Sequence, residues 1–271
     1  MTPVALNAAR EAAFRAGRPE IIAHRGASGE APENTMSAVR LAWRRGADAV
    51  EVDVHLSRDG RLVVMHDETT ARTAGVNRPI AAQSWDELRR LDAGAWMGAE
   101  WAGEPIPLLD DVLETIPSGR RLIVEIKCGP EAAEVLERAV GLAARPACEI
   151  AFISFSLDVC RRVKQMLPAH EVSLLSSFRR STPAGAWTPR IDALIETALA
   201  AGLDGLDLKY IGPLDQVWAR RIREAGLRLI VYTVDDPAEA RRLAATGVEG
   251  ITTNIPALLR RLTWTPQSPE R

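Results

Sequence analysis

Two acidic side chains, Glu51 and Asp53, lie two residues apart at the end of a short apolar run, AVEVDV. Side chains two apart in a β-strand share one face, so both carboxylates leave the strand on the same side. Glu125 and Lys127 repeat the arrangement in a second run, LIVEIK. If the two runs form neighbouring parallel strands, three carboxylates converge, and they repel one another unless a cation lies between them.

These acids have two interpretations. Acids at strand ends also occur as surface groups paired with arginines, and for one pair alone this would be the better interpretation. The repetition on a second strand favours a metal site with Glu51, Asp53 and Glu125 as its ligands. Because all three ligands are oxygens, we predict one divalent cation, Mg²⁺ or Ca²⁺, rather than zinc.

Two of the four histidines, His24 and His66, follow an apolar run and precede a charged residue, in HR and HD. An ordinary histidine pKa of about 6.5 allows one ring to act as a neutral base and another as a charged acid near neutral pH. We therefore predict that His24 and His66 form an acid–base pair. A lone histidine is more often structural, and we interpret His55 and His170 in this way.

Two cations, Arg25 and Lys127, lie among these acids and histidines. A guanidinium fork suits two oxygens of a phosphate, and an ammonium can neutralise further charge beside a metal ion. We interpret both as phosphate-binding groups, although charge balance for the carboxylates is an equally good interpretation of Lys127. In the loop after Arg25 we interpret Glu33 as structural and expect Asn34 or Thr35 to be the N-cap of a helix.

Short β-rich runs alternate with amphipathic helices along the chain, which predicts parallel βα units. Eight such strands predict a TIM (β/α)8 barrel, an α/β fold whose active sites lie at the carboxyl ends of the strands, where the acids and histidines fall. The predicted strands span residues 20–24, 47–54, 121–127, 149–155, 171–175, 205–209, 227–233 and 250–253. The predicted helices span residues 35–45, 131–144, 156–166, 190–201, 214–225, 237–246 and 256–262.

The regular alternation of predicted strands and helices is interrupted once, between the second and third predicted strands. Residues 56–120 are far more than one helix needs, and they contain a DG turn, the apolar run 62–65 and a tryptophan-bearing segment, AGAWMGAEWAGEPIP. Long insertions in compact domains are usually functional caps or lids. We predict a single domain over residues 1–271, with a barrel over about 20–262, this small insertion after the second strand, and a loosely held tail at 263–271.

The composition, with 46% apolar and 26% charged residues and a net charge of −2, is that of an ordinary soluble globular protein. So small a charge gives no general attraction to nucleic acid, and we expect a small-molecule substrate. No apolar stretch approaches the roughly 18 residues of a membrane span, and Arg10, Glu11 and Arg15 interrupt the N-terminal segment where a signal peptide is apolar. Three cysteines without metal-type pairing favour a reducing compartment, so we expect a cytoplasmic protein. The sequence leaves the oligomeric state open.

A series of short motifs runs along the chain in a fixed order. The motifs are HRG (24–26), PENT (32–35), EVDV (51–54), a passage from the DG turn to HD (59–67), EIK (125–127), ISFS (153–156), YTVDDP (232–237) and GVEGITTNIP (247–256). Together they resemble the glycerophosphodiester phosphodiesterase family. The resemblance extends over about residues 20–262, and HRG with ExD and HD at these spacings is a specific combination.

The resemblance implies a TIM barrel with a small insertion after the second strand and the same division of roles as the residues suggest. It implies metal ligation by Glu51, Asp53 and Glu125, acid–base chemistry by His24 and His66, and phosphate contacts by Arg25 and Lys127. The chain departs from the family's usual pattern at Tyr232, where tryptophan is common, and at Asp235, where asparagine is common. We expect Tyr232 to supply an aromatic wall for the substrate.

The activity that the resemblance implies is metal-dependent hydrolysis of a glycerophosphodiester to sn-glycerol 3-phosphate and an alcohol. The nucleophile is either water or a hydroxyl group of the substrate's own glycerol. One alternative is a phospholipase of the sphingomyelinase D or lysophospholipase D type, although such enzymes are typically secreted or membrane-seeking. Another is a phosphodiester-binding barrel without catalytic activity.

Overall fold

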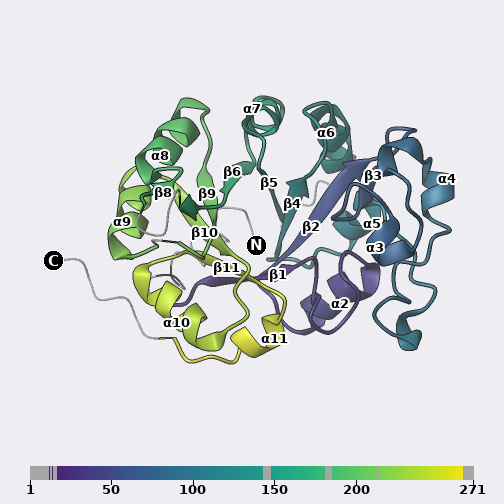
Figure 1. Ribbon diagram of the computed structural model, residues 1–271, viewed down its shortest axis with the longest axis horizontal. Coiled ribbons are helices and arrows are strands. Elements are labelled where there is room, and N and C mark those ends of the chain that lie inside the picture. The colour runs from purple at the N-terminus through teal and green to yellow at the C-terminus, as the bar shows by residue number, and fades with distance from the viewer. Residues whose placement is uncertain are drawn as a thin grey trace.

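The computed structural model describes residues 12, 14, 17–142, 148–180, 185–212 and 214–264 of the chain. Most of the N-terminal segment compared with a signal peptide lies outside these residues, as do residues 265–271 of the predicted tail and the end of the predicted helix 131–144. The helices surround a central group of strands (Figure 1).

Eight parallel strands close into a barrel, because β1 pairs with β2 on one side and with β11 on the other. The predicted TIM barrel is confirmed, and the observed strand ends differ from the predicted ones by at most two residues. The barrel strands are β1 (Glu20–His24), β2 (Ala49–Leu56), β4 (Arg121–Ile126), β5 (Glu149–Ser154), β6 (Glu171–Ser176), β9 (Gly205–Lys209), β10 (Arg228–Tyr232) and β11 (Gly250–Thr253).

The helices that follow the strands were also predicted from the sequence. In the helix that begins at Pro237, proline occupies the first turn and Gly247 follows the last residue with a φ of 95°, the usual start and stop signals. No helix in the described part of the chain is long and apolar enough to cross a membrane. The barrel helices are α2 (Met36–Arg44), α6 (Ala132–Leu142), α7 (Leu157–Met166), α8 (Ile191–Ala200), α9 (Gln216–Glu224), α10 (Pro237–Thr246) and α11 (Pro256–Leu259).

The alternation of side chains along β2 determines which residues reach the barrel interior. Val50, Val52 and Val54 are fully buried in the apolar core that the sheet shares with the helices. Glu51 and Asp53 are therefore on the opposite face, which points into the barrel. The burial of three valines on one side thus fixes both carboxylates on the other.

The amino ends of the strands are closed by buried ion pairs. Arg121 is 2% exposed; it lies 3.3 Å from Glu20 and 2.6 Å from Glu171, measured from guanidinium nitrogen to carboxylate oxygen. Arg228 contacts the same two carboxylates at 2.7 and 3.2 Å. All four residues begin or nearly begin their strands, so this cluster lies at the barrel end opposite to Glu51 and Asp53.

Replacing Arg121 by methionine is expected to lower the free energy of unfolding by about 3 kcal/mol, because the buried Glu20 and the partly buried Glu171 then have one cation fewer. Urea unfolding measures this change. The neighbouring Arg120 is a matched control, since its ion pair with Asp48 is partly exposed, and Arg120→Met should cost less than about 1 kcal/mol. Equal losses in the two variants would contradict a stabilising role for the buried cluster.

The residues between β2 and β4 form a small layer at one side of the barrel (Figure 1). This layer has its own apolar cluster, which includes Val63, Ile80 and Leu88. The strand β3 and the hairpin of β7 and β8 were not predicted, because runs of two or three residues give too little alternation to identify. The elements of the layer are β3 (Leu62–Val64), antiparallel to β2, α3 (Ala71–Ala74), η1 (Ile80–Ala82), α4 (Trp85–Leu88) and η2 (Ala99–Trp101). The helix α5 (Leu109–Glu114) follows them and packs on the barrel core beside α2 and α6. The hairpin is β7 (Arg179–Arg180) with β8 (Trp187–Thr188).

Candidate active site

Three carboxylates meet at the carboxyl end of the barrel, as the sequence predicted. Glu51 and Asp53 extend from β2, and Glu125 extends from the neighbouring β4, where it pairs in register with Asp53. One oxygen of each lies within 4.8 Å of one oxygen of each of the others. Their exposed fractions are 2%, 0% and 8%, so the cluster is almost entirely withdrawn from water.

The charges of this cluster are not balanced by the chain alone. Burial raises the pKa of Glu51 well above its usual range, and the charges of Asp53 and Glu125 raise it further. Burial, followed by the charge of Asp53, raises the pKa of Glu125 to about 7. Among the described residues, Glu51 Oε1 has no hydrogen-bond partner although it is buried. An unpartnered oxygen facing two further carboxylates fits the coordination of a hard divalent cation.

Two cations lie against this cluster. Lys127 Nζ is 2.6 Å from Glu125 Oε1 and 3.2 Å from Asp53 Oδ1. Arg25 Nε is 3.2 Å from Asp53 Oδ2. Burial opposes ionisation of Asp53, but Lys127 and Arg25 outweigh it and hold the pKa of this carboxyl below its usual range. Both predicted phosphate-binding cations are therefore at the site, and both contact its acids.

The loop between β1 and α2 is shaped to carry Arg25 and Asn34 towards Asp53. Both residues have a left-handed backbone, with φ values of 55° and 57°. Gly26 has a φ of 81°, and a side chain there would place its Cβ 2.5 Å from the carbonyl carbon of Ala38. Asn34 donates from Nδ2 to Asp53 Oδ2 at 2.8 Å and accepts from the Asp53 amide at 3.2 Å. The loop thus fixes the orientation of Asp53.

The helix cap in this loop is Thr35, one of the two residues expected. Its side chain accepts from the Ala38 amide at the start of α2. Asn34, the other candidate, instead holds Asp53, a role that was not predicted from the sequence. The position of Asn34 just before the threonine cap could have indicated this contact. Asparagine tolerates a left-handed backbone, which here brings its side chain back towards the sheet.

His24 ends β1 beside Glu51, with which it pairs in register. Its Nδ1 is 2.7 Å from Asn254 Oδ1, and the Asn254 amide donates from Nδ2 to Asp235 Oδ2 at 2.6 Å. The Asp235 carboxylate can only accept, so the Asn254 amide nitrogen points to Asp235 and its oxygen points to His24. His24 Nδ1 is therefore the donor in this hydrogen bond. Burial, with the charge of Arg25, lowers the pKa of His24. The ring therefore offers Nε2 to the site.

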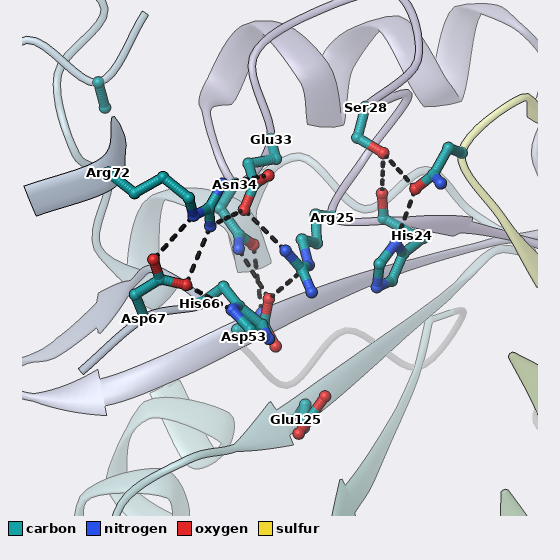
Figure 2. Close-up of polar contacts among 12 residues, drawn as sticks. His24, Arg25, Ser28, Glu33, Asn34, Asp53, His66, Asp67, Arg72 and Glu125 are labelled. Carbon is teal, nitrogen blue, oxygen red and sulfur yellow. Dashed lines mark hydrogen bonds and ion pairs between the residues drawn. The ribbon is translucent and has the colours of Figure 1, made fainter. Parts of the chain in front are cut away.

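His66 follows β3 and comes from the insertion rather than from a barrel strand. Its Nδ1 is 2.6 Å from Asp67 Oδ1, which in turn is bound by Arg72 (Figure 2). The carbonyl oxygen of His66 accepts from His55 Nε2 at 3.1 Å. His55 is thus structural, as expected, but it supports the His66 backbone directly. His170 binds the Ile150 carbonyl oxygen at 2.9 Å, in agreement with a structural role.

Two aromatic side chains, Tyr232 and Phe155, lie at the carboxyl ends of β10 and β5. Tyr232 packs against the interior cluster that contains Ile153, Leu175 and Ile230. Its hydroxyl group donates to the carbonyl oxygen of Ser176 at 3.1 Å, which fixes the ring. Phe155, with 53% of its surface exposed, meets the Tyr232 ring edge-on at 6.2 Å between centroids. The carboxyl ends of β1, β2 and β4 thus carry charged groups, and those of β5 and β10 carry aromatic groups.

Several residues that shape the site were not predicted. Their roles depend on contacts between distant parts of the chain. Asn254 is 230 positions from His24, and Arg72 is 39 positions from Glu33. Three of them had drawn attention in other roles: Glu33 as a structural residue, Asn34 as a candidate helix cap, and Asp235 as a departure from the family's usual pattern. These supporting residues are Glu33, Asn34, Asp67, Arg72, Asp235 and Asn254.

A TIM barrel with a buried acidic cluster, two histidines and two cations at the carboxyl ends of its strands is the arrangement of a metal-dependent hydrolase. The chain belongs to the glycerophosphoryl diester phosphodiesterase family, whose model matches residues 24–258. Enzymes of this family are phosphoric diester hydrolases.

Individual relatives agree with this assignment. The chain is 34% identical over 250 residues to a glycerophosphodiester phosphodiesterase of Caldanaerobacter subterraneus, a match that covers 89% of this chain and 96% of the other. It is also 30% identical to a glycerophosphodiester phosphodiesterase of Bacillus subtilis, over 89% and 85% of the two chains. Among solved structures, a phosphodiesterase of Oleispira antarctica in complex with the product sn-glycerol-3-phosphate superposes with a TM-score of 0.80 at 28% identity, covering 89% and 95% of the two chains. A glycerophosphodiester phosphodiesterase of Agrobacterium tumefaciens superposes with a TM-score of 0.73 at 28% identity, covering 90% and 100%.

Proposed function

We propose that this protein hydrolyses glycerophosphodiesters to sn-glycerol 3-phosphate and an alcohol. The observation that carries the proposal is the buried cluster of three carboxylates with two histidines and two cations at one end of the barrel. The relatives support it, since the Caldanaerobacter protein is named for this activity and the Oleispira structure holds sn-glycerol 3-phosphate as its product.

Glu51, Asp53 and Glu125 would hold one divalent cation, Mg²⁺ or Ca²⁺. When bound, the cation neutralises the cluster and polarises a phosphoryl oxygen. Arg25 and Lys127 lie beside the same acids. We assign them to the phosphate group, where a guanidinium fork and an ammonium stabilise the negative charge that develops on the oxygens.

The two histidines would move protons at their Nε2 atoms, because each Nδ1 is already bound, to Asn254 in one ring and to Asp67 in the other. Burial lowers the pKa of His24, which favours the neutral ring at physiological pH. We therefore assign His24 as the base that deprotonates the attacking hydroxyl group or water, and His66 as the acid that protonates the leaving alcohol.

Tyr232 would form part of the wall against which the alcohol portion of the substrate lies. Its neighbour Phe155 is 53% exposed at the barrel mouth, which favours a second candidate substrate with an apolar substituent. Hydrolysis of lysophospholipids, the lysophospholipase D reaction, is therefore the alternative to be tested. Replacement of Phe155 by alanine would then impair turnover of lysolipids more than turnover of small water-soluble diesters.

The test of the proposed function is a substrate panel assayed with Mg²⁺ and with Ca²⁺. We expect release of sn-glycerol 3-phosphate from at least one of glycerophosphocholine, glycerophosphoethanolamine, glycerophosphoglycerol, glycerophosphoinositol and lysolipids. EDTA should abolish the release, and a divalent cation should restore it. Binding of these compounds without turnover, under all metal conditions, would instead identify a catalytically inactive phosphodiester-binding barrel.

The cytoplasmic location, the single domain and the absence of a nucleic-acid partner remain predictions from the sequence. Two of the cysteines, Cys128 and Cys160, are thiols whose pKa burial raises to about 11 and about 12. Such thiols are slow to react and suit a reducing compartment. Cell fractionation tests the location.

A further inference from the structure

Arg72 lies on α3 in the insertion and is 43% exposed in its side chain. It binds two carboxylates at once. Its Nε and Nη2 donate to Asp67 Oδ2 and Oδ1 at 2.7 and 3.0 Å, and its Nη1 and Nη2 donate to Glu33 Oε2 and Oε1 at 2.9 and 2.7 Å. Four of the five N–H donors of the guanidinium group are therefore occupied.

Each of the two carboxylates also holds a residue that we assign to the reaction. Asp67 Oδ1 is 2.6 Å from His66 Nδ1, and Glu33 Oε1 accepts from Arg25 Nη1 at 2.8 Å. Figure 2 shows the resulting chain of contacts, which runs from His66 through Asp67, Arg72 and Glu33 to Arg25. A single side chain thus connects the catalytic histidine of the insertion to the phosphate-binding arginine of the barrel.

The segment that carries Arg72 is itself held in place. Thr70 precedes α3 and is fully buried; its hydroxyl group donates to the Val76 carbonyl oxygen at 2.6 Å and accepts from Gln83 Nε2 at 3.3 Å. Gln83 is 1% exposed and also donates to the carbonyl oxygens of Arg78 and Pro79. The turn is therefore fixed by buried hydrogen bonds, which limits the positions that Arg72 can adopt.

We propose that Arg72 is a positioning residue that keeps His66 and Arg25 in their working geometry, an inference that rests on the proposed function. Its Nη2 binds Glu33 Oε1 and Asp67 Oδ1 together, so without the guanidinium two carboxylates face each other and repel. Asp67 then turns away from His66, whose ring loses the acceptor that keeps Nδ1 protonated and Nε2 directed at the substrate. Lysine cannot substitute fully, because an ammonium group lacks the planar fork that binds both carboxylates.

The first test is kinetic. Arg72→Met should lower kcat about 10–100-fold, the usual effect of removing a group that orients a catalytic residue, and Arg72→Lys should restore only part of the loss. Arg78→Met is the matched control, because Arg78 lies in the same insertion, is similarly exposed and pairs with Glu87 away from the site; it should retain full activity. Methylguanidinium added at sub-denaturing concentration should partly rescue Arg72→Ala but not His66→Ala.

The second test requires no turnover. Histidine ¹⁵N NMR of the protein with Mg²⁺, at a pH where the rings are neutral, reports which nitrogen of each of the four rings carries the proton. We expect His66 to carry it on Nδ1 in the wild type and to become a mixture in Arg72→Lys and Arg72→Met, while His24 is unchanged. Unaltered His66 signals together with wild-type kcat in Arg72→Met would overturn the proposal. If no glycerophosphodiester is hydrolysed by the wild type, the proposed function fails, whereas the His66 signals still decide the role of Arg72.

Discussion

Alanine in place of His24 or His66 is expected to lower kcat by about 10²–10⁴-fold, the usual contribution of a positioned acid or base. Both rings have Nδ1 engaged, so each presents a single nitrogen to the substrate. The measurement is steady-state release of sn-glycerol 3-phosphate. His170→Ala is the control, because this ring binds the Ile150 carbonyl oxygen instead of a site residue, and it should change stability rather than turnover per folded molecule.

A substrate with a nitrophenolate leaving group separates the roles of the two histidines. Nitrophenolate departs without protonation, so loss of the acid matters less than loss of the base. We expect His66→Ala to recover most of its activity on this substrate and His24→Ala to remain impaired. The opposite pattern would exchange the two assignments, and near-wild-type turnover of both variants on every substrate would refute them.

Glutamine in place of Glu51 is expected to lower kcat by at least about 10²–10³-fold while making the metal-free protein more stable. Burial and the charges of Asp53 and Glu125 raise the pKa of Glu51 well above its usual range. An unfolded glutamate ionises at a lower pH than Glu51 does in the metal-free fold, so ionisation of this buried side chain costs folding free energy. This cost is absent in acid and grows as the pH rises. Glutamine avoids it, which should raise the free energy of unfolding of the metal-free protein at neutral pH.

Thermal and urea unfolding with and without Mg²⁺ or Ca²⁺ check this prediction. The cation should stabilise the wild type and have little effect on Glu51→Gln, because ligand binding to the folded state alone increases stability. Glu239→Gln on α10 is the control, since Glu239 pairs with Arg242 at the surface. A metal-free Glu51→Gln variant that is less stable than the wild type would contradict the prediction, because the hydrogen bond from the Arg25 amide to Glu51 Oε2 at 2.9 Å would then outweigh the cost of burying the charge.

The barrel and the acidic cluster were predictable because both follow from local patterns. Strand alternation places Glu51 and Asp53 on one face, and the adjacent strand then brings Glu125 to them. Contacts of the supporting residues were not predictable, because they join side chains that only the closed barrel brings together. Nothing local to Asn254 indicates that it binds His24, and nothing local to Arg72 indicates that it binds Glu33.

The insertion illustrates the same limit. Its existence was evident from the length of residues 56–120, and the expectation of a functional segment agrees with the position of His66 at the site. The strand β3 that carries the chain to His66 was missed, because Leu62–Val64 is a run of three apolar residues without alternation. It pairs antiparallel with the end of β2 across the DG turn at 59–60.

Anomalous diffraction from crystals grown with Mn²⁺, a hard divalent cation that can stand in for Mg²⁺ or Ca²⁺, tests the central claim most directly. We predict one strong peak at the barrel mouth, about 2.0–2.6 Å from an oxygen of each of Glu51, Asp53 and Glu125. A peak held by other residues, or none at the three carboxylates while the enzyme remains active, would contradict the account.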